Sequence, residues 1–252
     1  YYNRGVESYS SLSSSGYNDG SEKLIKKLKK SDEEFYRINK TFDSVFYNDS
    51  YVQDYRGVKV YTSVNSKYLY SFFTENNIPV LFDHPNYLAI PYENTVLNGE
   101  LSVKYYVSNN KIDTMTEILS YDGYYVYENE DYLPFGYLLK NNQIPDANNV
   151  RSMKNIVING SYLEGEITND SKDSAKMLIS IPYSKREYDI YIDDKLSRSF
   201  VINDGFLGLS IPEGKHVIRI KFKVPMLYEG IMFSLLGVFG YLVINIYLKK
   251  VK

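Results

Sequence analysis

The stretch from Gly230 to Leu248, GIMFSLLGVFGYLVINIYL, runs for 19 residues without a charged side chain. At about 1.5 Å per residue, a helix of this length spans roughly 28 Å, which is close to the thickness of a bilayer core. The chain then ends in Lys249-Lys250-Val251-Lys252. We therefore predict a transmembrane helix with a basic tail over residues 225–252. A buried helix of a soluble core is the alternative, and the C-terminal position of the stretch argues against it.

The orientation of this helix follows from the charges around it. Arg219, Lys221 and Lys223 precede the apolar stretch, and three lysines follow it. The preceding charges belong to a predicted folded strand, and long domains translocate largely regardless of charge. We expect a cytoplasmic C-terminus and an extracytoplasmic body.

The start of the sequence bears on the same question. The chain begins with Tyr1 and shows no signal peptide, so an external body requires an upstream membrane segment in a longer protein. If Tyr1 lay near the true start, the protein would instead be tail-anchored with a cytoplasmic body.

Composition excludes several classes of function. Lys and Arg total 29 against 31 Asp and Glu, so the chain lacks the basic excess of a nucleic-acid-binding protein. Cysteine is absent, which excludes disulfides, thiol catalysis and Cys-ligated zinc. The only histidines are His84 and His216. We expect no metal site, no cofactor and no nucleic-acid partner.

Residues 151–224 alternate short apolar runs with turn signals such as Asn159-Gly160 and Asp193-Asp194. Seven strands at this spacing predict a small all-β sandwich. The predicted strands are Lys154–Asn159, Tyr162–Asn169, Lys176–Ile181, Tyr188–Ile192, Arg198–Ile202, Phe206–Ser210 and Lys215–Val224.

The last of these strands alternates strictly, which indicates one buried and one exposed face. We interpret His216 as a core histidine, because it shares the apolar face with Ile218, Ile220 and Phe222. Asp193-Asp194 resembles a metal-binding pair, but its flanking strands favour a hairpin turn.

The N-terminal part has a mixed pattern. Residues 1–20 form a loop or linker rich in Ser, Gly and Asn, and residues 21–150 predict an α+β region. Ser21–Lys30 predicts a helix with Ser21 as its N-cap and Leu24, Ile25 and Leu28 as its apolar stripe. The other expected elements are a helix over Asn65–Asn76, strands over Phe35–Lys40, Leu101–Ser108 and Phe135–Lys140, and a hairpin over Met115–Glu128 that turns at Asp122-Gly123.

One irregular stretch, QDYRGVKVYTSVNSK over Gln53–Lys67, is the candidate binding segment. Arg56 offers a bidentate grip on phosphate, Ser63 is a candidate cap for the helix that follows, and Tyr61 and Asn65 complete the predicted substrate site. In the alternative interpretation this is a packed loop in which Arg56 pairs with a carboxylate. The sequence contains no GxGxxG, GxxxxGK[ST], HExxH or GxSxG motif.

Several segments together resemble the C-terminal part of the YfhO family of bacterial polytopic membrane proteins. The resemblance runs from about residue 33 to the C-terminus, and it departs from the family pattern at Glu187-Tyr188 and Asp193-Asp194. The matching segments are FYRINK (Phe35–Lys40), DYRGVKVYTSVN (Asp54–Asn65), LSVKYYV (Leu101–Val107), VYENEDYLPFGYLL (Val126–Leu139), LISIPY (Leu178–Tyr183), YIDDK (Tyr191–Lys195), IPEGKHVIRIKF (Ile211–Phe222) and YEG (Tyr228–Gly230).

The resemblance implies a multi-pass glycosyltransferase of the cell membrane that uses a polyprenyl-phosphate sugar. Such enzymes glycosylate lipoteichoic or wall teichoic polymers on the outer membrane face. Their catalytic carboxylate lies in an early extracytoplasmic loop outside this chain, so no catalytic residue is assigned here. This chain would be the large external domain plus the last membrane helix, and its partners would be the bilayer, the lipid-linked sugar and the anionic polymer.

Two other functions fit the pattern as well. One is a non-catalytic, membrane-tethered β-sandwich that binds cell-wall carbohydrate, and the other is a membrane-anchored assembly protein.

Overall fold

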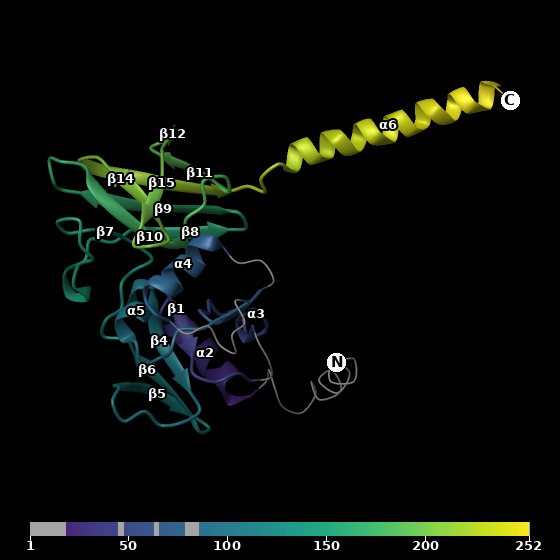
Figure 1. The fold of residues 1–252 in the computed structure, drawn as a ribbon. Coiled ribbons are helices and arrows are strands. Elements are labelled where there is room, and N and C mark those ends of the chain that lie inside the picture. Colours follow the sequence, from purple (N-terminus) through teal and green to yellow (C-terminus); the bar gives the residue numbers. More distant parts are fainter. Residues whose placement is uncertain (1–18, 45–47, 63–65, 79–85, 252) are drawn as a thin grey trace.

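The computed structural model describes residues 19–44, 48–62, 66–78 and 86–251. Within these residues a body of helices and sheets is followed by one long C-terminal helix that extends away from it (Figure 1). The predicted class, an α+β region followed by a β-sandwich and an apolar helix, is confirmed.

The α+β region contains a four-stranded sheet in the order β1-β4-β6-β5. Strand β1 runs parallel to β4, and the other pairs are antiparallel. The predicted hairpin turn is confirmed, because Asp122 and Gly123 have φ angles of 52° and 77°, as a type I′ turn requires. The strands are β1 (Arg37–Lys40), β4 (Val103–Ser108), β5 (Glu117–Tyr121) and β6 (Tyr124–Glu128).

Helix α2 (Gly20–Ser31) packs against this sheet. Its predicted stripe of Leu24, Ile25 and Leu28 is buried. The predicted N-cap, Ser21, is wrong by two residues: Asp19 caps the helix, and its side chain accepts a hydrogen bond from the Ser21 backbone N–H.

Short elements connect this sheet to the rest of the body. In helix α4 (Lys67–Glu75), Phe72 and Phe73 are buried, as the spacing predicts. Ser66 caps α4 through the Tyr68 N–H, so the assignment of that cap to Ser63 was wrong. The remaining elements are α3 (Asp49–Val52), β2 (Val60–Tyr61), β3 (Tyr87–Leu88), α5 (Thr95–Glu100) and the 3₁₀ turn η2 (Ala147–Asn149).

The sandwich consists of a four-stranded sheet, β13-β14-β10-β7, and a five-stranded sheet, β12-β11-β15-β9-β8. All seven predicted strands are present. Two features were not predicted from the sequence: the two-residue strand β12, and the pairing of β7 with β10. The strands are β7 (Gly136–Leu138), β8 (Lys154–Asn159), β9 (Tyr162–Asn169), β10 (Ala175–Pro182), β11 (Tyr188–Ile192), β12 (Lys195–Leu196), β13 (Phe200–Ile202), β14 (Phe206–Ile211) and β15 (Gly214–Phe222).

The four-stranded sheet of the sandwich is covered on both faces. Met177, Leu178 and Ile179 in β10 are all fully buried. Met177 and Ile179 join the core between the two sheets, whereas Leu178 joins a second core that contains Phe72 of α4. The sandwich and the α+β region therefore share packed surface along this sheet.

His216 is not the core residue that we predicted. Its side chain is 13% exposed, and its Nδ1 lies 2.6 Å from Oδ2 of Asp193. The polar partner comes from the β11–β12 turn, where Asp193 and Asp194 have φ angles of 49° and 65°. That turn confirms the hairpin interpretation of the Asp193-Asp194 pair.

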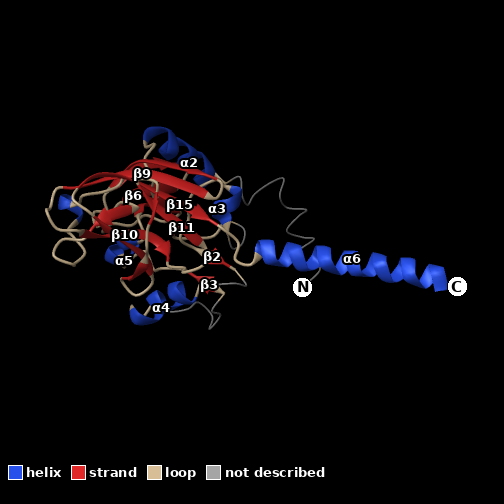
Figure 2. Cartoon of the chain, turned by 90° about the horizontal axis from the view of Figure 1, so that it is seen from above, coloured by secondary structure: helices blue, strands red, loops and turns tan. Residues whose placement is uncertain are grey.

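Helix α6 (Leu227–Val251) extends away from the body in both views (Figures 1 and 2). The most apolar 18-residue window of its segment Leu227–Lys250 has a mean hydropathy of 2.0, and none of that window is buried inside the molecule. A helix that is apolar on all sides and unburied requires an apolar solvent, and a bilayer supplies one.

Candidate binding cleft

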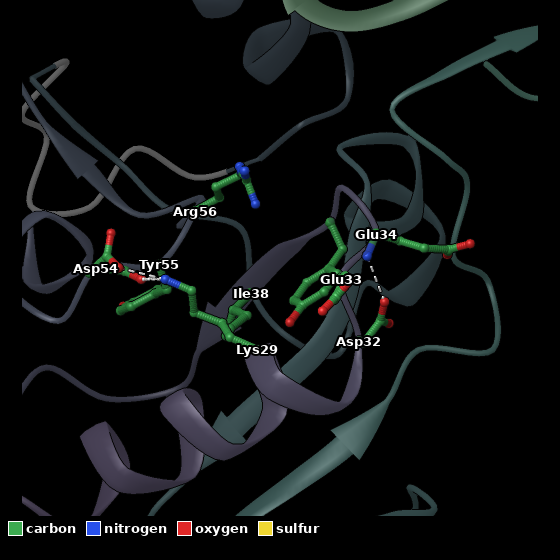
Figure 3. Close-up of a pocket in the computed structure, with 9 residues that line it drawn as sticks. Lys29, Asp32, Glu33, Glu34, Ile38, Asp54, Tyr55 and Arg56 are labelled. Atoms are coloured by element: carbon green, nitrogen blue, oxygen red, sulfur yellow. Dashed lines mark hydrogen bonds and ion pairs between the residues drawn. The ribbon is translucent and has the colours of Figure 1, made fainter. Parts of the chain in front are cut away.

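A cleft of about 410 Å³ lies beside strand β1, between the end of α2 and the segment that follows α3 (Figure 3). Arg56, the leading residue of the predicted site, lines it. The full lining is Lys29, Asp32, Glu33, Glu34, Tyr36, Ile38, Asp54, Tyr55 and Arg56.

Backbone pairing on the outer edge of β1 builds this cleft. The Ile38 N–H donates to the Arg56 carbonyl at 2.8 Å, and Ile38 forms a parallel bridge with Gly57. A Cβ atom on Gly57 would lie 2.8 Å from the Ser50 Cβ, so the close approach requires a glycine here. The DYRG segment is thereby fixed along β1, with Arg56 at the cleft.

The guanidinium of Arg56 is exposed and stacks on an aromatic ring. Its Cζ lies 4.5 Å from the centroid of Phe35, which is a cation–π distance. No carboxylate among the described residues lies within ion-pair distance of it. Within this part of the chain, the alternative in which a carboxylate neutralises Arg56 is wrong.

A second guanidinium, that of Arg37, lies 5.8 Å from the same Phe35 ring. It donates to the Leu101 carbonyl at 2.7 Å and to the hydroxyl and carbonyl oxygens of Ser180 at 2.9 and 2.8 Å. Burial, with a smaller contribution from the positive charge of Arg56, lowers the pKa of Arg37 to about 10. Arg37 remains charged at neutral pH, and the repulsion between the two guanidinium groups favours an anion beside Phe35.

Two carboxylates of the cleft are held by hydrogen bonds. Asp32 accepts from the Glu34 N–H at 2.9 Å and from Lys104 Nζ at 2.5 Å. Burial acts to raise the pKa of Asp32, but these bonds hold it below its usual value. Lys29 lies 2.6 Å from Asp54 Oδ2 and lowers the Asp54 pKa (Figure 3). Both groups are ionised at neutral pH and are unsuited to act as general acids.

Two tyrosines provide aromatic surface. Tyr36 is 4% exposed, and its hydroxyl has no hydrogen-bond partner among the described residues. Burial raises the pKa of Tyr36 to about 12, with a further contribution from Asp32. Burial also raises the pKa of Tyr55, followed in size by the charge of Asp49. Both phenols are therefore neutral at neutral pH, and the Tyr36 hydroxyl is buried.

The structure separates the predicted site residues. Arg56 lines the cleft, but Tyr61 lies on β2 and is not part of the lining; its backbone N–H and carbonyl bind the Asn48 side chain at 2.8 Å each. Ser63 and Asn65 lie outside the described residues. Sequence reasoning missed Lys29, Asp32 and Tyr36, because only the bridge between Ile38 and Gly57 places them opposite Arg56.

The cleft is lined by charged side chains of both signs. In the described ranges, no three His, Asp or Glu side chains are placed to hold a metal ion. A guanidinium without an acidic partner suits a phosphate, and neighbouring carboxylates suit sugar hydroxyls.

Comparison with known proteins identifies a membrane protein family, in agreement with the presence of an apolar helix. The family model described as bacterial membrane protein YfhO matches residues 6–151 and 142–234. No curated protein matches the chain, and neither does any solved structure. The two matched ranges cover most of the sequence, and helix α6 is long and apolar enough to cross a bilayer. The chain belongs to the YfhO family of bacterial membrane proteins.

Proposed function

We propose that this chain is the extracytoplasmic domain and last membrane helix of a multi-pass glycosyltransferase. The enzyme transfers a sugar from a polyprenyl-phosphate donor to a phosphate-bearing cell-surface polymer, such as lipoteichoic or wall teichoic acid. In this proposal the catalytic residues lie outside the chain, and the domain holds the acceptor polymer over the membrane.

The main support for this proposal is the exposed Arg56 guanidinium, which has no acidic partner in the described part of the chain. Its guanidinium is exposed and lies 4.5 Å from the centroid of Phe35, with no carboxylate partner among the described residues. A polymer of alternating phosphate and polyol units offers both an anion for Arg56 and hydroxyl groups for its neighbours. Arg37 adds positive potential without occupying the cleft.

The topology belongs to the same proposal. The three lysines after the apolar stretch favour a cytoplasmic C-terminus. The body then lies outside the cell, on the side where an anionic wall polymer is found.

The test replaces Arg56 in the full-length protein, expressed in cells that lack the native copy. We expect Arg56→Ala to reduce polymer glycosylation by about 10-fold or more, since a charge-assisted bidentate contact contributes roughly 1.5–3 kcal/mol. Arg56→Lys keeps the positive charge but loses the bidentate guanidinium geometry, so it should retain more glycosylation activity than Arg56→Ala.

Arg198→Ala is the matched control. Arg198 is exposed, does not line this cleft, and forms no ion pair within the described chain. Wild-type glycosylation by Arg56→Ala at wild-type protein level would refute the assignment of Arg56. Polymer binding by full-length protein that transfers no sugar would favour the tethered carbohydrate-binding module instead.

A further inference from the structure

The alternation of β15 continues beyond the end of the sandwich core. On its apolar face Ile218 and Ile220 are 0% and 3% exposed. Continuing in steps of two residues, Phe222, Val224 and Met226 are 46%, 56% and 63% exposed. This apolar row leaves the core at the end of β15, passes through a turn in which Met226 has a φ of 61°, and ends beside the first turn of α6, which begins at Leu227.

Basic side chains surround this row. Lys221 and Lys223 occupy the intervening positions of the strand and the linker. The Lys223 N–H donates to the Glu187 carbonyl at 2.8 Å, which places the Lys185-Arg186 turn beside the end of β15. Lys185 and Arg186 are exposed and have no carboxylate partner in the described part of the chain, whereas Lys223 pairs with Asp189.

The distance to the membrane is short. Only residues 223–226 separate β15 from α6, and four extended residues reach about 13 Å. In both views α6 leaves from this end of the body (Figures 1 and 2). The exposed apolar row and the basic residues therefore lie near the membrane surface.

We propose that this end of the sandwich is a membrane-docking surface for anionic phospholipids. Phe222, Val224 and Met226 enter the interfacial layer, while Lys185, Arg186 and Lys221 contact lipid phosphates. Exposed apolar side chains next to a span gain an apolar environment there, and each nearby cation gains from the surface potential. The inference needs only that α6 spans the bilayer, and it does not depend on the transferase activity.

Docking would fix the height and tilt of the body. A four-residue linker alone lets the sandwich change its tilt, whereas contacts from the Lys185-Arg186 turn, the end of β15 and the linker define one orientation. The body would then present its surfaces at a constant distance from the membrane.

Because the sequence contains no cysteine, a single introduced cysteine can be labelled specifically. Single cysteines replace Ser161, whose carbonyl accepts the Phe222 N–H at 2.7 Å, or Glu213, which precedes the opposite end of β15. Each 252-residue protein is labelled with a fluorophore and reconstituted into vesicles that carry a headgroup-level quencher. One set of vesicles is neutral phosphatidylcholine, and the other contains about 30% phosphatidylglycerol.

We expect strong quenching at position 161 in the anionic vesicles, weaker quenching in the neutral ones, and little at position 213. The triple variant K185Q/R186Q/K221Q should lower the ratio of docked to free body on the order of 100-fold. Its matched control, K111Q/K154Q/K172Q, removes three exposed charges elsewhere and should behave as wild type. Circular dichroism confirms that each variant is folded.

Equal quenching at positions 161 and 213 in anionic vesicles would overturn the docking surface. If quenching at position 161 changes neither with lipid charge nor with the triple substitution, the role of anionic lipid would be overturned.

Discussion

Nδ1 of His216 lies 2.6 Å from Oδ2 of Asp193, across the junction between β15 and the β11–β12 turn. The other carboxylate oxygen of Asp193 accepts the Val217 N–H at 2.9 Å. The hydrogen bond to Asp193 raises the pKa of His216 despite the opposing effect of burial, and it lowers the pKa of Asp193. One polar pair thus ties the turn to the neighbouring strand.

This pair predicts the direction of a pH effect. The folded-state pKa of His216 is raised, so its contribution to stability is complete below about 6.5 and is lost as pH rises through the folded value. The contribution of Asp193 is lost as pH falls through its lowered pKa. An NMR titration of the His84→Asn protein should place the His216 pKa above 6.5, and Asp193→Asn should lower it. A His216 pKa at or below the value for a free peptide would contradict the ion pair.

Arg37 joins the α+β region to the sandwich. Its three hydrogen bonds reach the Leu101 carbonyl and both oxygens of Ser180, which is 2% exposed. Arg37→Ala removes this donor from the two carbonyls, whereas the Ser180 hydroxyl keeps its hydrogen bond with the Ser102 hydroxyl at 2.8 Å. The substitution should cost about 2–4 kcal/mol in the free energy of unfolding. The lysine of Arg37→Lys cannot reach all three acceptors, so this variant should recover only part of the lost stability. Urea denaturation measures both, and a loss below about 0.5 kcal/mol for the Ala variant would contradict this role.

The contact between Gly205 and α4 leaves no room for a side chain. A Cβ on Gly205 would lie 2.1 Å from the Tyr68 carbonyl oxygen. Gly205→Ala must therefore displace α4 from β14 and should destabilise the fold by about 1–3 kcal/mol. Gly123→Asn is the control, because its Cβ would meet nothing within 4 Å and Asn tolerates a φ of 77°. Equal melting temperatures for the two variants would show that α4 does not pack as described.

Lys40 and Asp49 form a buried ion pair, with 1% and 4% of their side chains exposed. Lys40 Nζ lies 2.8 Å from Asp49 Oδ2 and 3.1 Å from Gln53 Oε1. Removing one partner leaves an uncompensated charge, so Lys40→Met should cost about 3–5 kcal/mol. The double variant K40M/D49L removes both charges and should be more stable than Lys40→Met in urea denaturation. A double variant that is less stable would contradict charge burial as the cause.

Much of the fold follows from local sequence. The Asp122-Gly123 turn and the Asn159-Gly160 turn mark hairpins, and the alternation in β15 identifies its buried face. These signals are local because turn dihedrals and strand periodicity depend on neighbouring residues.

The remaining features depend on pairings between distant segments. Met177, Leu178 and Ile179 read as one apolar run, and the sequence does not reveal that Leu178 faces a different core. His216 lies on the same face of β15 as the core residues, yet Asp193 from the β11–β12 turn determines its surroundings. Arg56 was found from its own chemistry, whereas Tyr36 and Lys29 join it only through the bridge between Ile38 and Gly57. The predicted domain boundaries remain predictions.

In the proposed function, Arg56 binds phosphate of the acceptor polymer. The most direct measurement is equilibrium binding of a short poly(glycerol phosphate) oligomer to the 252-residue chain in neutral nanodiscs. The claim predicts salt-sensitive binding that Arg56→Ala weakens about 10-fold or more and Arg198→Ala leaves unchanged. Binding of the oligomer by Arg56→Ala with wild-type affinity would contradict it.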